Sequence, residues 1–465
     1  MLARRRARRR RPGRPLPALL AAGLLTAAAL AGAAARGDMP ILLAAGEVTD
    51  TSAIIWARGV EPGDLAVDVR SLAGRPAASA VIRGTTASDL AGQARVDGLT
   101  PATRHRYTVR GGGRGAEGKF TTAPRPSDPA PVRLLWGADL GSRGHCRPSD
   151  GEYAIVRAMA ARKPDLLVLA GDTVYADHHC HALPPDAPGA MPATTLDQFH
   201  AKHRHNRAGP AVQQLLRATP VLATWDDHEV RNNFAGEHGL AAVGRRAFLD
   251  YWPVAALPSL VRSARWGRLL ELFLIDTRSH RDRACRPDGP GKSMLGAAQR
   301  RWLVDAVADS GARGKAIVSS VPLSIPKAWP CGESWAPTRV LFLETGFSRE
   351  RDLILAELAR RRTRNVVVLA GDVHFAAITT LRPAPGLVVH ELIAGPLAAA
   401  TERPRAPDAR LAPVVRFSRG GLANFGEVEI DEEGLTVRIL DAGGRALATE
   451  RFRADEALSD RSRAP

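Results

Sequence analysis

The pentapeptide Val-Leu-Ala-Gly-Asp occurs twice in this chain, at Val168–Asp172 and at Val368–Asp372. Each copy closes a short apolar run that is typical of a strand buried on both faces. Glycine permits a sharp turn, which leaves the aspartate at the carboxyl end of the strand, the edge where open α/β sheets bind ligands. Tyr175 follows the first aspartate and His374 follows the second. Carboxylates, a phenol and an imidazole at one sheet edge indicate a site for hard metal ions.

Two further apolar runs end in polar residues of the same kind. Val132–Trp136 leads to Asp139, and Val221–Thr224 leads to Trp-Asp-Asp-His-Glu, which begins at Trp225. One Gly-Asp turn or one histidine is usually structural, but four strand ends that deliver such groups favour a metal site. The candidate residues at these ends are Asp139, Asp172, Tyr175, Asp226, Asp227, His228, Asn232, Asp372 and His374.

Two regions with different sequence patterns supply the elements that must position these residues. Residues 47–123 show short alternating strands separated by turn residues, which predicts a small β-sandwich. After a proline-rich linker, strands alternate with helices, as in an α/β domain. The expected strands there include Val221–Thr224, Leu269–Ile275, Ala316–Ser319, Gly426–Asp431 and Leu435–Leu440, and the expected helices include Glu152–Arg162, Gln299–Ser310 and Arg349–Arg361. We expect a leader at 1–36, the β-sandwich at 37–123, the linker at 124–131, the catalytic domain at 132–455 and a tail at 456–465.

The composition is that of a soluble globular protein, and 465 residues suffice for two or three domains. The net charge of +17 is misleading, because eight arginines lie within the first fourteen residues, and removing these eight charges leaves +9. A diffuse arginine excess of this size disfavours a nucleic-acid interface.

The amino terminus predicts export. A basic head precedes the apolar stretch Leu16–Ala35, which ends in three alanines, as in a secretory signal peptide. An uncleaved membrane anchor is the alternative, but the stretch is only weakly apolar. We therefore expect a periplasmic or extracellular protein, with the Sec and twin-arginine routes both open.

The four cysteines include no Cys-x-x-Cys pair, so disulfides are favoured over a thiolate zinc site. Cys146 and Cys180 flank the first aspartate motif, and Cys285 and Cys331 lie in later loops, so we predict the pairs 146–180 and 285–331.

Two groups of histidines lie outside the strand ends. We interpret His178, His179 and His181 as a solvent-exposed rim. The second group is expected on a surface helix, with a position beside the pocket as the alternative, and consists of His200, His203 and His205.

The motifs Asp-x-Gly, Gly-Asp-x-x-Tyr, Asp-His-Glu and Gly-x-x-His together resemble those of the calcineurin-like metallophosphoesterases. The spelling Trp-Asp-Asp-His-Glu-Val-x-Asn-Asn, with Gly-Asp-Val-His later, is similar to the PhoD-like alkaline phosphatases, and the resemblance extends from Glu47 to Phe452. It implies a four-layer α/β/β/α sandwich preceded by a small fibronectin type III-like β-sandwich, with two metal positions. Asp139 stands where PhoD-type enzymes usually carry cysteine, a spelling closer to purple acid phosphatases.

The resemblance also implies a role for each candidate. The tyrosine favours Fe(III) in one position, and the oxygen donors of the other favour Ca, with Mn, Zn and Mg as alternatives. The first position would use Asp139, Asp172, Tyr175 and His374, and the second would use Asp227, Asn232 and Asp372, with Asp172 bridging the two. Phosphate would be oriented by Asn232 and Arg278, and His228 would protonate the leaving oxygen.

The implied activity is hydrolysis of phosphate monoesters at alkaline pH, by attack of a hydroxide that bridges the metals. A phosphodiesterase acting on nucleotides or phospholipid headgroups is one alternative, and a non-catalytic cell-surface binding protein is another. The expected partner is a small phosphate ester. We expect no nucleic acid as a structural partner and no stable membrane partner once the leader is cleaved, and the sequence leaves the oligomeric state open.

Overall fold

The computed structural model describes residues 39–141, 146–148, 151–255, 260–327, 331, 333–340 and 342–453. The described residues from Ile41 onward belong to one compact unit. The predicted leader and the predicted tail lie outside the described residues, so both stay predictions. Among the helices of the described ranges, none combines the length and the apolarity that a membrane span requires.

The larger of two central sheets contains the first three predicted strand ends. Its strands, in spatial order, are β22 (Ala446–Arg453), β21 (Gly434–Asp441), β20 (Asn424–Ile430), β8 (Val132–Gly137), β9 (Leu166–Ala170), β10 (Val221–Thr224), β1 (Leu42–Gly46), β2 (Ser52–Arg58) and β5 (Ala91–Asp97). β8, β9 and β10 are parallel neighbours, so their carboxyl ends share one edge. β9 and β10 are buried throughout, as uninterrupted apolar runs predict.

The second central sheet contains the fourth strand end. Its order is β11 (Arg262–Trp266), β12 (Leu270–Leu274), β13 (Gly314–Val318), β16 (Val366–Ala370), β18 (Leu387–Ile393), β17 (Ala376–Ala384) and β19 (Val414–Arg419). β12, β13, β16 and β18 run parallel. A separate hairpin is formed by β14 (Thr338–Val340) and β15 (Leu343–Thr345).

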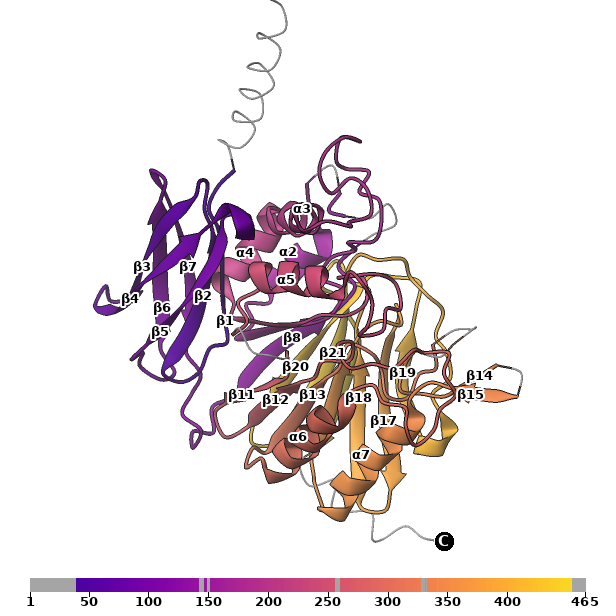
Figure 1. The fold of residues 1–465 in the computed structure, drawn as a ribbon. Coiled ribbons are helices and arrows are strands. Elements are labelled where there is room, and N and C mark those ends of the chain that lie inside the picture. Colours follow the sequence, from indigo (N-terminus) through magenta and orange to yellow (C-terminus); the bar gives the residue numbers. More distant parts are fainter. Residues whose placement is uncertain are drawn as a thin grey trace, which may run out of the picture. The chain divides into compact units, whose positions relative to one another are not determined.

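Helices complete the predicted four layers. They are α2 (Ala154–Ala161), α3 (Leu196–Arg207), α4 (Pro210–Ala218), α5 (Ala241–Tyr251), α6 (Gly296–Asp309) and α7 (Ser348–Arg360), with short 3-10 turns η1 (Thr86–Ser88) and η2 (Ala409–Leu411). Side chains from both central sheets form one core between them, Trp136 and Ile378 included. α6 and α7 cover the outer face of the second sheet (Figure 1), where Leu303 and Leu358 are buried. α2 and α4 pack on β9. The α/β/β/α prediction is confirmed.

The amino-terminal β-sandwich is also present, but it shares a sheet with the rest of the chain. One layer is β4 (Pro76–Gly84), β3 (Gly63–Ser71), β6 (Arg104–Gly111) and β7 (Arg114–Thr121), and it faces β1, β2 and β5 across a core that contains Ile55, Tyr107 and Phe120. β1 joins the larger sheet by parallel pairing of Gly46 with Val221 on β10. The domain boundaries predicted from composition stay predictions.

Candidate functional site

The four predicted strand ends meet at one place. Asp172, Asp227 and His228 present ligand atoms within 4.8 Å of one another, and so do Asp226, Asp227 and Asp372. Asp227 belongs to both groups, so it lies between the aspartates of the two Val-Leu-Ala-Gly-Asp segments. All of these carboxylates are buried. The edges of two different sheets therefore supply a single acidic site.

The backbone at these strand ends adopts the left-handed conformation. The φ angles are +63° at Asp139, +50° at Asp172, +69° at Asp372 and +57° at His374. Non-glycine residues rarely adopt this conformation, and each one costs on the order of 1 kcal/mol or more. Close packing explains one nearby glycine, because a Cβ on Gly395 would lie 2.4 Å from the Asp139 carboxylate. Such strain concentrates where a structure must aim side chains at a ligand.

The four residues predicted for the first metal position converge around Tyr175. Its hydroxyl lies 3.2 Å from Nε2 of His374, and the same nitrogen lies 3.7 Å from Asp139 Oδ1. Tyr175 is buried, and its pKa is raised by burial and then by Asp172 and other carboxylates. Its ring stacks on His228 with 4.1 Å between ring centroids. The raised pKa favours the neutral phenol in the absence of a cation, and a bound cation would favour the phenolate.

Two basic side chains, Arg278 and Lys327, form ion pairs with the second group of carboxylates. Arg278 is fully buried and contacts Asp226 (2.5 Å), Asp227 (3.4 Å) and Glu333 (3.0 Å). Lys327 Nζ lies 2.5 Å from Asp372 and 2.5 Å from Glu333. We did not predict Lys327 or Glu333, because both lie in an irregular loop without a motif.

His228 is oriented by the carboxylate of Asp177, a residue to which the sequence motifs assign no role. Its Nδ1 lies 2.8 Å from Asp177 Oδ1, and its backbone N–H donates to Asp172 Oδ1 at 3.0 Å. Burial lowers the pKa of His228, but Asp227 and Asp177 outweigh burial and raise it to about 9. The ring is therefore held as an imidazolium with a fixed direction.

A buried glutamate joins the ends of β9 and β10. Glu229 accepts hydrogen bonds from the backbone N–H groups of Asp172 (3.1 Å), Thr173 (2.6 Å) and Asp226 (2.7 Å), and from the Thr173 hydroxyl (2.7 Å). Both strand ends depend on this one side chain for their turn geometry. The motif Trp-Asp-Asp-His-Glu pointed to Glu229, but the motif alone does not show whether this glutamate binds a metal or supports the backbone by hydrogen bonds.

The two predicted phosphate-binding residues differ in burial, since Asn232 is exposed and Arg278 is buried. Asn232 is exposed at the rim, and its backbone N–H donates to Asp177 Oδ2 at 2.8 Å. Arg278 already has three carboxylate partners, so direct contact with a phosphate would require one of those ion pairs to open. The contacts of Arg278 instead fit a residue that neutralises and positions the carboxylates.

The donor set fits hard cations. Both carboxylate oxygens of Asp139, Oδ1 of Asp227 and Oδ2 of Asp372 are buried without a hydrogen-bond partner among the described residues. The pKa values of Asp139 and Asp172 are raised well above normal by burial and by the surrounding carboxylates. A buried unpaired carboxylate is costly, and coordination of a cation removes that cost. The available atoms are oxygens and imidazole nitrogens, which are donors suited to metal ions.

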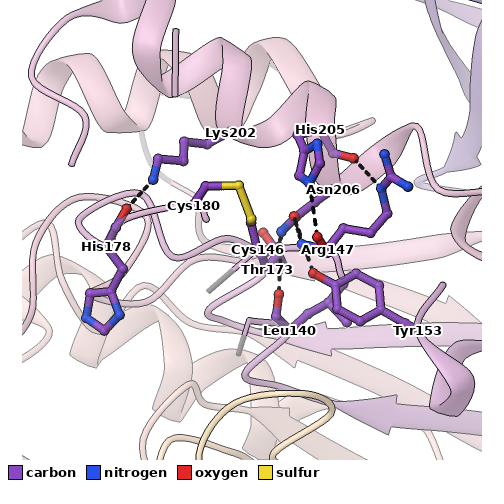
Figure 2. The surroundings of a disulfide bond; sticks show 10 residues. All are labelled: Leu140, Cys146, Arg147, Tyr153, Thr173, His178, Cys180, Lys202, His205 and Asn206. Carbon is purple, nitrogen blue, oxygen red and sulfur yellow. Dashed lines mark hydrogen bonds between the residues drawn. A yellow bond between two sulfur atoms is a disulfide. The ribbon is translucent and has the colours of Figure 1, made fainter. Parts of the chain in front are cut away.

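The predicted disulfides are both present, Cys146–Cys180 and Cys285–Cys331. The first ties the loops after β8 and β9 together beneath α3 (Figure 2). From α3, Lys202 Nζ donates to the backbone oxygen of His178, and Asn206 Oδ1 accepts from the Arg147 backbone N–H at 3.0 Å. The disulfide thus fixes the segment that carries Tyr175 and Asp177.

The expectation of a surface helix for His200, His203 and His205 was wrong for two of the three. His200 and His203 are buried, whereas His205 is half-buried beside Arg147. α3 packs against α5, and His200 lies 2.9 Å from Asp250 while His203 stacks on Tyr251. The polar composition of α3 concealed this burial. The expected rim residue His178 is half-buried, in contact with the Tyr175 and His228 rings.

A family model described as PhoD-like phosphatase matches residues 142–437, which is more than half of the chain. The chain belongs to the PhoD-like phosphatase family. It is 27% identical to alkaline phosphatase D of Bacillus subtilis over 311 residues, which are 60% of this chain and 52% of that protein. The chain therefore spans about half the length of the curated relative it matches.

Solved structures show the same fold. The structure of PhoD superposes with a TM-score of 0.73 at 19% identity and covers 88% of each chain. A purple acid phosphatase from yellow lupin (Lupinus luteus) seeds superposes with a TM-score of 0.58 at 11% identity, covering 89% of this chain and 74% of the other. The PhoD-like chain thus has the architecture that its motifs predicted.

Proposed function

We propose that this PhoD-like chain is an exported metal-dependent phosphoesterase that releases phosphate from monoesters at alkaline pH. The observation that carries the proposal is the buried cluster of carboxylates, several of whose oxygens accept no hydrogen bond from the described residues, which two sheets bring together beside Tyr175 and His374. Family membership supports ester hydrolysis. The two disulfides support an oxidising compartment and therefore export.

We assign the metals as predicted from the donors. Asp139, Asp172, Tyr175 and His374 would hold Fe(III), and Asp227 with Asp372 and Asn232 would hold Ca. Bound metals would polarise the phosphoryl group and lower the pKa of water at the site. The contact of Lys327 with Asp372 supplies a positive charge at the second position in this structure.

The residues of the chain would control the proton and the geometry. Asp177 holds Nδ1 of His228, which directs the other ring nitrogen to donate a proton to the leaving oxygen. Stacking against Tyr175 keeps the imidazole in one plane. Glu229 fixes the turn that carries Asp172, and Arg278 offsets the charge of Asp226 and Asp227.

The test compares 4-nitrophenyl phosphate with bis(4-nitrophenyl) phosphate on purified protein, with elemental analysis of the bound metal. We expect two metals per chain, faster turnover of the monoester and an alkaline optimum. Faster turnover of the diester would replace the monoester proposal with the phosphodiesterase alternative. Full metal occupancy without turnover of either ester would favour a non-catalytic binding protein.

A further inference from the structure

A second concave site lies at the opposite end of the two central sheets. Its cavity volume is about 100 Å³, and it is open to solvent. It opens where β13 and β16 begin, whereas the metal site lies where β9 and β16 end. β20, β21 and β22 of the larger sheet supply one wall, and β17, β18 and β19 of the second sheet supply the other.

The floor of this site, here called the sheet-base pocket, is apolar and aromatic. Phe452 is buried and contacts the His390 ring with 3.9 Å between ring centroids. Ile430, Leu435 and Val367 line the remainder. Two sheets that diverge at this end leave apolar side chains exposed to a cavity instead of to each other. Such a floor favours an apolar or aromatic body in a ligand.

The rim is strongly basic. Among the described residues that line the sheet-base pocket, one is acidic and four are arginines. The acidic residue is Asp431, whose carboxylate accepts from the backbone N–H groups of Glu433 and Gly434, and the arginines are Arg313, Arg382, Arg416 and Arg453. Within the described part of the chain, no carboxylate forms an ion pair with Arg313, Arg416 or Arg453. Arg416 donates to the Thr380 hydroxyl at 3.4 Å and lies over Phe452.

We propose that the sheet-base pocket binds an amphiphilic organic anion, whose carboxylate or phosphate head contacts the arginines and whose apolar body lies on Phe452. Guanidinium groups match the planar or tetrahedral oxygens of such heads, and the apolar floor discriminates against inorganic ions. This ligand site is separate from the metal centre and is independent of ester hydrolysis. The positive field is consistent with His390, whose pKa is lowered to about 4 by burial and by Arg416 and Arg382.

The first test uses 8-anilinonaphthalene-1-sulfonate, an aromatic anion whose fluorescence rises when it is bound. We expect Arg416→Gln and Arg453→Gln each to weaken binding about three- to tenfold, since a single charge-assisted contact is worth roughly 1 kcal/mol at an exposed site. Arg360→Gln is the matched control, because Arg360 is an exposed arginine at the end of α7 that does not line the pocket, and its loss should leave binding unchanged. Equal binding by all four proteins would overturn the proposal.

A second variant introduces a negative charge into the apolar lining of the pocket. Leu435→Glu places a carboxylate on a half-buried wall position and should weaken binding of the probe more than tenfold. Leu353→Glu introduces the same charge at an exposed position on α7 and is the control. Thermal unfolding and hydrolysis of 4-nitrophenyl phosphate, both expected to match the parent, establish that the Leu435 variant is folded. If that variant does not fold, the arginine variants decide the question.

Competition identifies the head group and separates this site from the proposed active site. Decanoate and decyl phosphate should displace the probe, the stronger of the two naming the preferred head, while decanol and inorganic phosphate at equal concentration should not. Displacement by decanol would show an apolar groove without anion selectivity, and displacement by inorganic phosphate would show a simple anion site. Either result would overturn the proposal, whether or not the esterase activity is found.

Discussion

Asp172 and Asp372 end identical pentapeptides and have similar left-handed φ angles, yet their surroundings differ. Asp172 accepts a backbone hydrogen bond from His228 and lies among other carboxylates. Asp372 contacts the ammonium group of Lys327. The pKa of Asp372 is raised to about 7, because burial outweighs Lys327, whereas that of Asp172 is raised well above normal without a comparable cation.

The difference shows that five identical residues determine where a carboxylate is placed but not which charge faces it. The strand, the glycine and the turn are local properties. The opposing charge comes from elsewhere in the chain, 45 residues before Asp372 in the case of Lys327. We therefore expect the two aspartates to respond differently to the same substitution.

The largest effect is expected for Asp172→Asn. Because Asp172 is the proposed bridge, this variant should lose both metals and at least about 10³-fold in kcat, equivalent to roughly 4 kcal/mol. Asp372→Asn should lose one metal and retain more activity. Metal content per chain and steady-state kinetics measure both, and equal metal loss in the two variants would contradict an asymmetric site.

The next largest effect concerns the proton that His228 is proposed to donate to the leaving oxygen. His228→Ala should slow hydrolysis of alkyl phosphates roughly 10²- to 10³-fold and that of 4-nitrophenyl phosphate much less, since a good leaving group does not need a general acid. Asp177→Asn should reproduce this selectivity in weaker form, because it releases Nδ1 of His228. Identical losses on both substrates would count against the acid role.

A third effect is the pH dependence of stability without metal. The folded-state pKa values of Asp139, Asp172 and Asp372 are raised above the unfolded values, with Asp372 at about 7. The unfolded chain ionises first, so chelated protein should lose stability as pH rises from about 4 to 7 and above. Thermal unfolding from pH 5 to 8 measures this fall, which should shrink in Asp372→Asn and disappear when metal is restored. A chelated protein equally stable at both pH values would refute the proposed origin of the shifts.

The smallest expected effect tests whether Lys327 competes with a metal ion for Asp372. Lys327→Met removes a positive charge from the second position, so the affinity for the second metal should rise roughly tenfold, while the metal-free protein should become less stable. Lys292→Met is the control, because the ammonium group of Lys292 donates to two backbone oxygens and lies over the Phe347 ring instead of contacting the carboxylates of the site. Titration against a graded chelator provides the affinity. Unchanged affinity would mean that Lys327 does not compete with the metal.

The closeness of Asp139 and Asp172 was predictable, because parallel neighbours in one sheet bring their carboxyl ends to one edge. Asp372 joins them from the second sheet, so its position depends on how the two sheets pack. Lys327 and Glu333 were missed because an irregular loop carries no periodicity that would place them. The burial of His200 was missed because packing of α3 on α5 is a tertiary contact between two polar helices.

The pairing of β1 with β10 determines how this chain can be shortened. β10 pairs with β9 along its whole length and with β1 at one position, Val221 with Gly46. A chain that begins at residue 132 would lack β1, β2 and β5 and would make the apolar strand Val221–Thr224 the edge of the larger sheet. Such an edge recruits strands from other molecules. We therefore expect the amino-terminal strands to protect the larger sheet from pairing with other molecules.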